Sequence, residues 1–594
     1  MRMQSTGERL RIAVIDYSRC QPKKCSLECI KFCPGVRMGD ETIVMDDARG
    51  KPVISELLCT GCGICVKKCP FEAITIVNLP DELDRDKVHQ YGENGFRVFR
   101  LPYPKEGVVT GLIGENGIGK TTILKILAGE LVPNFGEDSA DKQRVLEHFA
   151  GTQLYDYFKA LYAGEIKTVH KPQYVDALPK VVSGEVRELL SSIDERGGMR
   201  EIVEKLELEH ALERTLDQLS GGELQRVAIA AALLREGDVY IFDEPSSYLD
   251  VAQRLRVGRV IRELAQEKRV ILVEHDLVVL DYLADYVHVL YGKPGAYGIV
   301  SHPRSVRQGI NVYLNGYLRE ENVRIRSEPV RFEVRPPVVA REENLLLSFS
   351  KLSKSYNGFE LEVAGGEFYR GEVVGVLGPN ATGKTTFVKM LAGVIEPDEG
   401  EVSTSARVAY KPQYIKPEFS GTVLEALAKV VTLGDAFFEN EIARPLDLKS
   451  LYDHKVKELS GGELQRVAIA LCLAREADVY LLDEPSAYLD VEQRLRVAKM
   501  IRRVMEKREA LAIVVDHDIL FIDYISDRAM VFSGEPGVRG EATPPLEMRS
   551  AMNTFLRNVD ITFRRDPETG RPRANKPGSV KDREQKARGE YYYL

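Results

Sequence analysis

The same glycine-rich pattern, Gly-x4-Gly-Lys-Thr, occurs twice in the chain, at residues 114–121 and 378–385. Each copy follows an apolar stretch typical of a buried strand, Val108–Ile113 in the first and Val373–Leu377 in the second, and precedes a helical pattern. Glycines in such a loop let backbone N–H groups approach phosphate oxygens at a helix N-terminus. These two P-loops predict an α/β fold with two nucleotide-binding sheets.

The lysine and threonine that end each P-loop have defined chemistry. Lys120 and Lys384 are expected to reach the β- and γ-phosphates, and Thr121 and Thr385 to ligate Mg²⁺. The predicted phosphate-binding residues are Gly114, Asn116, Gly117, Gly119, Lys120, Thr121 and Thr122 in the first copy and Gly378, Asn380, Gly383, Lys384, Thr385 and Thr386 in the second.

Each copy continues to an apolar strand that ends in two acids, Asp243-Glu244 and Asp483-Glu484. The aspartate is expected to hold the Mg²⁺ shell, and the glutamate to orient or deprotonate a water molecule. A single acidic pair at a strand end is usually only solvated. Its position after a P-loop, and its duplication, favour a catalytic role for Glu244 and Glu484.

A third shared motif, Leu-Ser-Gly-Gly-Glu-Leu-Gln-Arg, begins at Leu219 and Leu459, between the P-loop and the acid pair. It is the signature of ABC-type ATPases, which the chain therefore resembles. The resemblance implies Q-loop residues near Mg²⁺ and histidines that contact the γ-phosphate in catalysis. The positions that match are Gln173 and Gln413 for the Q-loops, Asp250 and Asp490 for the D-loops, and His275 and His517 for the switch histidines.

In ABC proteins two cassettes close head-to-tail, and ATP binds between one P-loop and the signature of the other cassette. By this resemblance one site uses Lys120 with Ser460, and the other uses Lys384 with Ser220. The signature N–H groups would bring a second positive helix end to the γ-phosphate. The predicted signature contacts are Ser220, Gly221, Gly222, Glu223, Ser460, Gly461, Gly462 and Glu463.

Adenine usually stacks on an aromatic residue upstream of the P-loop. The candidates are Tyr91 or Phe96 in the first copy and Tyr356 or Phe359 in the second. A place in the hydrophobic core accounts for these aromatic residues about equally well.

Eight of the nine cysteines lie between Cys20 and Cys69, which indicates metal ligands. The run Cys59-x2-Cys62-x2-Cys65-x3-Cys69-Pro is that of bacterial ferredoxins, whose fourth cysteine ligates the other cluster. The first run is looser, and a pair of zinc sites is the alternative. The ferredoxin rule predicts two [4Fe-4S] clusters, the first on Cys20, Cys25, Cys29 and Cys69 and the second on Cys59, Cys62, Cys65 and Cys33. The ninth cysteine, Cys472, is expected to be a small buried residue.

The spacing of the copies exposes an insertion. The P-loop lysines are 264 residues apart, whereas the signature serines and the Q-loop glutamines are 240 apart. The first copy therefore holds 24 extra residues near 133–169. Two helical stretches are expected there, Asp141–Phe149 and Gln153–Tyr162, and form either a partner-docking helix–loop–helix or a surface elaboration.

A second repeat follows the copies, since Gly309–Leu314 resembles Ala551–Leu556. These segments are expected to form paired halves of a hinge. The stretch Arg564–Gly589 then carries nine Lys and Arg against four acids. It is either a solvated tail or a basic strap that docks onto an acidic surface or onto RNA phosphate.

The composition excludes several classes. The net charge is −8, which argues against a simple nucleic-acid coat, and the longest apolar runs fall far short of the roughly 18 residues of a membrane span. We expect a cytoplasmic protein without membrane spans.

The complete order of motifs closely resembles the ABC-type ribosome-recycling factors of the E subfamily, also called the RNase L inhibitor family, over Arg11–Leu594. The resemblance implies an α/β fold with two ABC-type P-loop nucleotide-binding domains plus an N-terminal α+β ferredoxin-like domain with two clusters. The implied boundaries are 1–78 for the iron–sulfur domain, 79–300 and 343–540 for the nucleotide-binding domains, 301–342 for hinge 1, and 541–594 for hinge 2 with the strap.

The family also implies an activity and partners. ATP-driven closure of the cassettes would swing the iron–sulfur domain and split post-termination or stalled ribosomes, and the protein would stay on the small subunit until hydrolysis. The implied partners are rRNA and proteins of the small subunit, a release or rescue factor and initiation factors, and the implied state is a monomer with no membrane partner. The cofactors would be two [4Fe-4S] clusters, ATP and Mg²⁺.

Two other functions remain open at this point. The chain could be an iron–sulfur electron-transfer protein gated by ATP, or the soluble ATPase partner of a transporter. No flavin, haem or substrate-site motif follows the cysteines, which favours a mechanical role for the clusters over an electron-transfer role.

Overall fold

The computed structural model describes residues 10–17, 19–47, 49–56, 58–79, 86–137, 139–173, 175, 177–326, 328–332, 344–356, 358–403, 406–413, 419–432 and 434–592. Among these residues, no helix is long and apolar enough to cross a bilayer.

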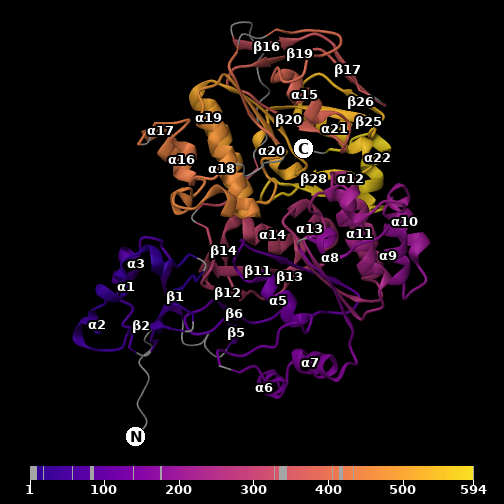
Figure 1. Ribbon diagram of the computed structural model, residues 1–594. Helices are drawn as coiled ribbons and strands as arrows, with labels where there is room; N and C mark the ends of the chain where they lie inside the picture. Colours follow the sequence, from indigo (N-terminus) through magenta and orange to yellow (C-terminus); the bar gives the residue numbers. More distant parts are fainter. Residues whose placement is uncertain are drawn as a thin grey trace.

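The N-terminal domain is a small α+β unit beside the first large sheet (Figure 1). Strand β1 (Leu10–Ile15) pairs antiparallel with β4 (Ile74–Leu79), and β2 (Ile43–Asp46) pairs with β3 (Lys51–Ile54). The short helices α1 (Glu28–Lys31), α2 (Pro34–Met38) and α3 (Ile64–Lys68) carry or adjoin the cysteines. Buried Ala13, Ile15, Ile43, Ile54 and Ile74 form its core together with three of the cysteines.

The first large sheet and its helices are called cassette 1. Its strand order is β5-β6-β12-β11-β7-β10-β9-β8, and β11, β7, β10, β9 and β8 are parallel. The central β7 (Val109–Ile113) and β9 (Val239–Asp243) are buried along their whole length, as expected for parallel strands covered on both faces. The other strands are β5 (Lys87–Gln90), β6 (Arg97–Phe99), β8 (Thr168–Lys171), β10 (Arg269–Val273), β11 (Tyr286–Lys293) and β12 (Tyr297–Val300).

Cassette 2 repeats this topology with the order β17-β18-β26-β25-β20-β24-β23-β22, so the duplication predicted from the motifs extends to the whole sheet. The bounds are β17 (Leu352–Tyr356), β18 (Phe359–Val363), β20 (Val373–Leu377), β22 (Val408–Lys411), β23 (Val479–Asp483), β24 (Leu511–Val515), β25 (Arg528–Glu535) and β26 (Arg539–Ala542). A separate small sheet joins β16 (Leu345–Phe349), β19 (Gly366–Tyr369) and β21 (Val402–Ser403).

Equivalent helices occupy equivalent places in the two cassettes. They are α5 (Lys120–Leu127) and α15 (Lys384–Leu391) after the P-loops, α11 (Gly221–Leu234) and α18 (Gly461–Leu473) after the signatures, α12 (Val251–Leu264) and α19 (Val491–Arg508) after the D-loops, and α13 (Leu277–Leu283) and α20 (Ile519–Ile525) after the switch histidines. The smaller helices are α8 (Leu178–Val181), α9 (Val186–Ser192), α10 (Met199–Lys205), α16 (Val423–Leu427) and α17 (Ala436–Phe438). Cys472 in α18 is buried, as predicted.

The insertion of cassette 1 forms the two expected helices, α6 (Lys142–His148) and α7 (Gln153–Ala163). Its aromatic face turns inward, because Phe158 is fully buried and Phe149 stacks on it with ring centroids 5.4 Å apart. The aromatics therefore anchor the insertion to cassette 1, and only its other face is left for a partner.

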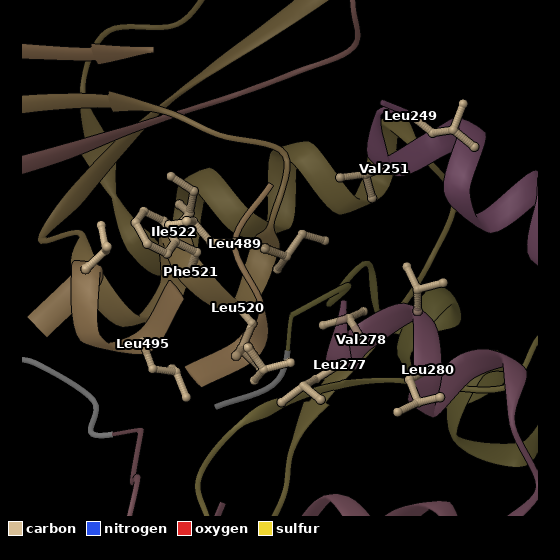
Figure 2. Close-up of a cluster of buried hydrophobic side chains, with 14 of the residues drawn as sticks. Leu249, Val251, Leu277, Val278, Leu280, Leu489, Leu495, Leu520, Phe521 and Ile522 are labelled. Atoms are coloured by element: carbon tan, nitrogen blue, oxygen red, sulfur yellow. The ribbon is translucent and has the colours of Figure 1, made fainter. Parts of the chain in front are cut away.

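The two cassettes share one continuous hydrophobic core (Figure 2). Leu249 and Leu489 come from the two D-loops, and α13 contacts α20. Side chains of both helices, among them Val278 and Leu520, line this contact in Figure 2. The cassettes therefore meet through apolar packing as well as through the polar groups of their sites.

The predicted hinge halves are amphipathic helices, α14 (Val306–Asn315) and α21 (Met548–Asn558). The C-terminal residues add β28 (Phe563–Arg565), β29 (Pro572–Ala574) and α22 (Val580–Arg588). Asn311 of α14 donates to Asp566 at 3.0 Å and to Glu568 at 2.9 Å, so the first hinge contacts the second.

Three arginines of the basic strap dock onto carboxylates of both cassettes. Arg571 and Arg573 bind Asp281 of α13, at 3.0 and 2.7 Å, and Arg565 binds Asp523 of α20 at 2.9 Å. The side chains of Asp281 and Arg571 are at most 1 % exposed. Of the alternatives for the strap, docking onto acidic residues of the cassettes is confirmed for these arginines.

Asp281→Ala should destabilise the protein strongly, because it leaves the buried Arg571 guanidinium without its carboxylate. Removing one partner of a buried pair typically costs about 3–5 kcal/mol. We expect a clear drop in the midpoint of chemical unfolding. The exposed pair of Arg187 and Glu213 gives the control, since Glu213→Ala should cost about 1 kcal/mol or less. Equal effects of the two variants would contradict a stabilising role for the buried pair of Asp281 and Arg571.

Candidate active site

Each P-loop wraps around its own lysine. Lys120 Nζ donates to the carbonyls of Gly114 and Glu115, both at 2.8 Å, and Lys384 Nζ donates to Gly378 O at 2.8 Å. Burial lowers the pKa of Lys384 to about 8 and also lowers the pKa of Lys120. The loop therefore holds a desolvated cation at the N-terminus of the following helix, where anionic phosphate would restore its charge balance.

A conformational constraint fixes the last glycine of each loop. Gly119 and Gly383 adopt φ of +97° and +93°, which favours glycine. A Cβ at Gly119 would lie 2.9 Å from the Phe96 ring, and one at Gly383 would lie 3.2 Å from Phe359. Phe96 and Phe359 thus pack beneath the loops.

The other adenine candidates, Tyr91 and Tyr356, are nearly half exposed. The Tyr91 hydroxyl lies 3.2 Å from Thr122 Oγ1 in the first turn of α5, beside the P-loop. The exposed Tyr91 ring is therefore better placed to stack on a base than Phe96 is.

The residues expected around Mg²⁺ come together in pairs. Thr121 Oγ1 donates to Asp243 Oδ2 at 3.1 Å, and Thr385 Oγ1 donates to Asp483 Oδ2 at 2.9 Å. Burial, and next the charge of Glu484, raise the pKa of Asp483 to about 6. A hydroxyl beside a crowded carboxylate fits a hard cation with oxygen ligands, which would offset this cost.

Glu244 and Glu484 occupy strained positions at the ends of their strands. Both have left-handed backbone conformations, with φ of +48° and +50°. The Gln173 amide donates to Glu244 at 2.6 Å, and Gln413 donates to Glu484 at 2.6 Å. The side-chain nitrogen of each Q-loop glutamine thus donates to the glutamate. The amide oxygen stays available for the cation near which these glutamines were predicted.

The switch histidines complete this arrangement. His275 Nε2 lies 3.2 Å from Glu244 Oε1, and His517 Nε2 lies 3.4 Å from Glu484 Oε1. Burial would raise the pKa of both glutamates, but contacts with the histidines and the charge of the P-loop lysines lower it to about 2. Each glutamate is thus ionised near neutral pH, as a group that orients water must be.

The D-loops bind the P-loops of the opposite cassettes. Asn116 N donates to Asp490 Oδ2 at 2.8 Å, and Asn380 N donates to Asp250 Oδ2 at 3.0 Å. The Tyr248 and Tyr488 rings meet edge-to-face, with centroids 6.1 Å apart. The P-loop of each cassette is therefore paired with the D-loop of the other, in the head-to-tail order that the motifs predict.

The signature residues stand at the N-termini of α11 and α18. Ser220 and Glu223 form a reciprocal capping box, as do Ser460 and Glu463. Ser220 and Ser460 are exposed, and their hydroxyls donate to Glu223 and Glu463, at 2.8 and 2.7 Å, so a phosphate would have to replace these hydrogen bonds.

Two pairs of residues that were not predicted from the sequence hold the strand ends at Glu244 and Glu484. Lys171 and Lys411 are buried and donate to the carbonyls of Asp243 and Asp483, at 3.0 and 2.7 Å. Burial lowers the pKa of each lysine to about 8. Gln225 and Gln465 of the signature helices donate to the carbonyls of the two glutamates. The sequence does contain a sign of them, because the two lysines and the two glutamines are each 240 residues apart, as the motifs are.

The cysteines gather in the two predicted sets. One cavity is lined by Cys20, Cys25, Cys29 and Cys69 together with prolines and apolar side chains. In the second set, the thiols of Cys33 and Cys62 act on the pKa of Cys59, and those of Cys59 and Cys62 act on the pKa of Cys65.

Burial keeps one thiol of each set protonated when no metal is bound. Burial raises the pKa of Cys29 to about 11 and that of Cys65 to about 12, so a metal would have to displace their protons. Within the described ranges, no three His, Cys, Asp or Glu side chains are arranged as ligands of one metal ion.

Comparison with protein families agrees with this division of the chain. The ABC transporter family matches residues 103–247 and 361–487. A possible Fer4-like domain of RNase L inhibitor matches residues 10–41, and the 4Fe-4S binding domain matches residues 52–75. The chain thus joins two ATPase cassettes to an iron–sulfur-binding segment.

Similar proteins cover the full chain. An uncharacterised ABC transporter ATP-binding protein of Methanocaldococcus jannaschii is 60 % identical over 99 % of this chain and 98 % of its own. The structure of ribosome-bound archaeal Pelota and ABCE1 matches with a TM-score of 0.93 and 59 % identity, over 99 % of this chain and all of the other. The complex of archaeal ribosomal stalk protein aP1 with archaeal ribosome recycling factor aABCE1 matches with a TM-score of 0.83 and 57 % identity, over 86 % of this chain and all of the other.

The combined substitution of Glu244→Gln and Glu484→Gln should stall hydrolysis while ATP stays bound. Glutamine keeps the size of the side chain but cannot accept a proton, and loss of such a group typically costs roughly 10²–10⁴-fold in rate. Phosphate release and nucleotide retained after gel filtration measure the two effects. Glu236→Gln, at an exposed position, is the control. Undiminished turnover in the double variant would refute the assignment.

Proposed function

The chain belongs to the E subfamily of ABC-type ATPases, the RNase L inhibitor family, and on that premise we propose that it is a ribosome-recycling ATPase. ATP-driven closure of the cassettes splits post-termination or stalled ribosomes into subunits, and the protein stays on the small subunit until hydrolysis. Similar proteins have been solved bound to the ribosome and in complex with a ribosomal stalk protein, which supports ribosomal partners here.

We propose two composite ATP sites. Site one uses Lys120, Thr121, Asp243 and Glu244 with Ser460 and Asp490, and site two uses Lys384, Thr385, Asp483 and Glu484 with Ser220 and Asp250. Mg²⁺ binds the threonine and aspartate of each site. The observation that carries this proposal is the pair of hydrogen bonds between D-loops and opposite P-loops, because it makes each site depend on both cassettes.

The same scheme divides the chain into working parts. We propose the iron–sulfur domain at 1–78, the nucleotide-binding domains at 79–300 and 343–540, hinge 1 at 301–342, and hinge 2 with the strap at 541–594. These limits stay predictions.

Motion of cassette 1 would reach the iron–sulfur domain through Asn94. This side chain is fully buried and donates to the carbonyls of Ala13 and Ile54, at 3.3 and 2.7 Å, and it accepts from Ile54 N at 2.7 Å. Arg97, also buried, pairs with Glu56 of the same domain. In the sequence, Asn94 and Arg97 lie between Tyr91 and the P-loop strand β7. A change at site one would therefore move the iron–sulfur domain as well.

We propose that the domain holds two [4Fe-4S] clusters as mechanical parts. Cys20, Cys25, Cys29 and Cys69 would bind the first, and Cys33, Cys59, Cys62 and Cys65 the second. The thiolates would hold each cluster, and a bound cluster would link short helices that bury little core of their own. A rigid domain can transmit force to a factor in the cleft between the subunits.

Ribosomes incubated with this protein, ATP and a release factor should separate into subunits on a sucrose gradient. The variant with Glu244→Gln and Glu484→Gln should remain on the small-subunit fraction, since it cannot leave by hydrolysis. Intact ribosomes throughout the gradient would overturn the proposal.

Cys62→Ser should abolish subunit splitting but leave part of the ATPase activity, because Cys62 lies in the iron–sulfur domain and not in the cassettes. Cys472→Ala is the matched control, as Cys472 is buried in cassette 2 and belongs to neither cysteine set. Its splitting activity should be retained. Full splitting by a protein without clusters would contradict the mechanical role and reopen electron transfer.

A further inference from the structure

Site one carries an excess of acidic groups at the cassette interface. Glu115 of the first P-loop faces Asp490 and Glu492 of cassette 2, and burial together with these two charges raises the pKa of Glu115. Asp490 is only 2 % exposed and already accepts from Asn116 N. Three carboxylates therefore meet where the cassettes must approach each other over an ATP molecule that is itself anionic.

One buried arginine from the first hinge lies among these acids. Arg326 follows α14, and its side chain is 10 % exposed. Its Nε donates to Glu492 Oε2 at 3.0 Å, and its charge also acts on Glu115. Two more cations lie near this cluster: Arg496, which is half exposed and lies 3.3 Å from Glu492, and the P-loop lysine Lys120, whose pKa is affected by Asp490 and Glu115. A buried ion pair is screened far less than an exposed one, so Arg326 compensates Glu492 more effectively than Arg496 does.

Arg326 also binds the end of the hinge helix. Its Nη1 donates to the carbonyls of Tyr313 and Leu314, at 2.9 and 2.8 Å, and its guanidinium lies over the Tyr313 ring. A single side chain thus connects α14, which lies between the two cassettes (Figure 1), with the first turn of α19 beside the D-loop.

Site two keeps the D-loop aspartate as Asp250 and the counterpart of Arg496 as Arg256, but it lacks the other groups at the equivalent positions. The offsets of the repeats place Pro379 opposite Glu115, Ala252 opposite Glu492, Phe555 opposite Tyr313 and Glu568 opposite Arg326. The P-loop lysine and threonine, the acid pair, the signature, the Q-loop glutamine, the D-loop aspartate and the switch histidine recur in both sites, although the P-loops differ at Glu115 and at two further positions. The charges around the D-loop are thus one difference between the sites.

We propose that Arg326 is a positioning residue for site one, which offsets the charges of Glu492 and Glu115 beside Asp490 so that the cassettes close over ATP, and which couples that closure to α14. Site two closes without such a residue. The inference rests on the two composite sites of the proposed function and adds that only site one is linked to the first hinge by charge.

The test measures closure at each site separately. Glu244→Gln traps nucleotide at site one, and Glu484→Gln traps it at site two, so the half-life of retained ATP after gel filtration reports each site. Arg326→Ala should shorten retention about tenfold or more in the Glu244→Gln background, within the usual range of coupling between sites. Retention in the Glu484→Gln background should stay within about twofold. Equal loss at both sites would overturn the inference.

A second variant separates charge compensation from simple capping of α14. Glu492→Ala introduces alanine, which cassette 1 carries at the equivalent position 252. In the double variant with Arg326→Ala, the glutamate that would otherwise be left without its arginine is also removed. Retention at site one should return to within about threefold of the level with Arg326 intact, and raised salt should partly rescue Arg326→Ala alone. If Arg326 acts only by capping α14, neither change will help, and the inference fails.

Arg496→Ala is the matched control, since this exposed arginine contacts the same glutamate, and it should change retention at site one by less than about threefold. A loss as large as that of Arg326→Ala would refute a special role for the hinge arginine. Absence of trapping at both sites with Arg326 intact would instead refute the composite sites, so the two failures are distinguishable.

Discussion

Each D-loop aspartate performs two tasks at once, and both nucleotide sites depend on them. Asp490 accepts from Gln493 N with one oxygen, which caps α19, and from Asn116 N of the opposite P-loop with the other. Asp250 does the same for α12 and Asn380. A helix N-terminus is thereby fixed to a P-loop in the other cassette. Each P-loop is thus joined to the opposite cassette, so the proposed sites would make ATP binding an event of the whole pair.

Buried charges between the sites reinforce this dependence. Asp276 and Asp518 follow the two switch histidines and act on each other across the interface. Each is held by an arginine of its own cassette, Arg254 and Arg494, and Arg254 also donates to the carbonyl of His517 at 3.4 Å. These charges are tolerated in a low-dielectric interface only while they stay paired. Separation of the cassettes would expose them to water, so opening and closing exchange ion pairing for hydration.

The sequence predicted the duplicated sheets, the P-loops and the two cysteine sets because each depends on short motifs whose chemistry is local. The aromatic residues of the insertion were expected on apolar faces, and Phe158 is indeed buried. Long-range pairs could not be predicted in this way. Arg571 lies 290 residues from Asp281, and Arg326 lies 166 residues from Glu492. Only the folded chain identifies which acid each arginine meets, since both residue types are common on solvated surfaces.

Duplication explains the common chemistry of the two sites, and small charge differences explain how they can differ. The strap binds Asp281 and Asp523 at equivalent positions of α13 and α20, but Asp281 meets two arginines whereas Asp523 meets Arg565 and the Tyr592 hydroxyl. The hinge adds Arg326 on one side only. Because the proposed catalytic residues recur in both cassettes, surroundings such as these are one source of inequality between the proposed sites, through the ease with which each half of the interface closes.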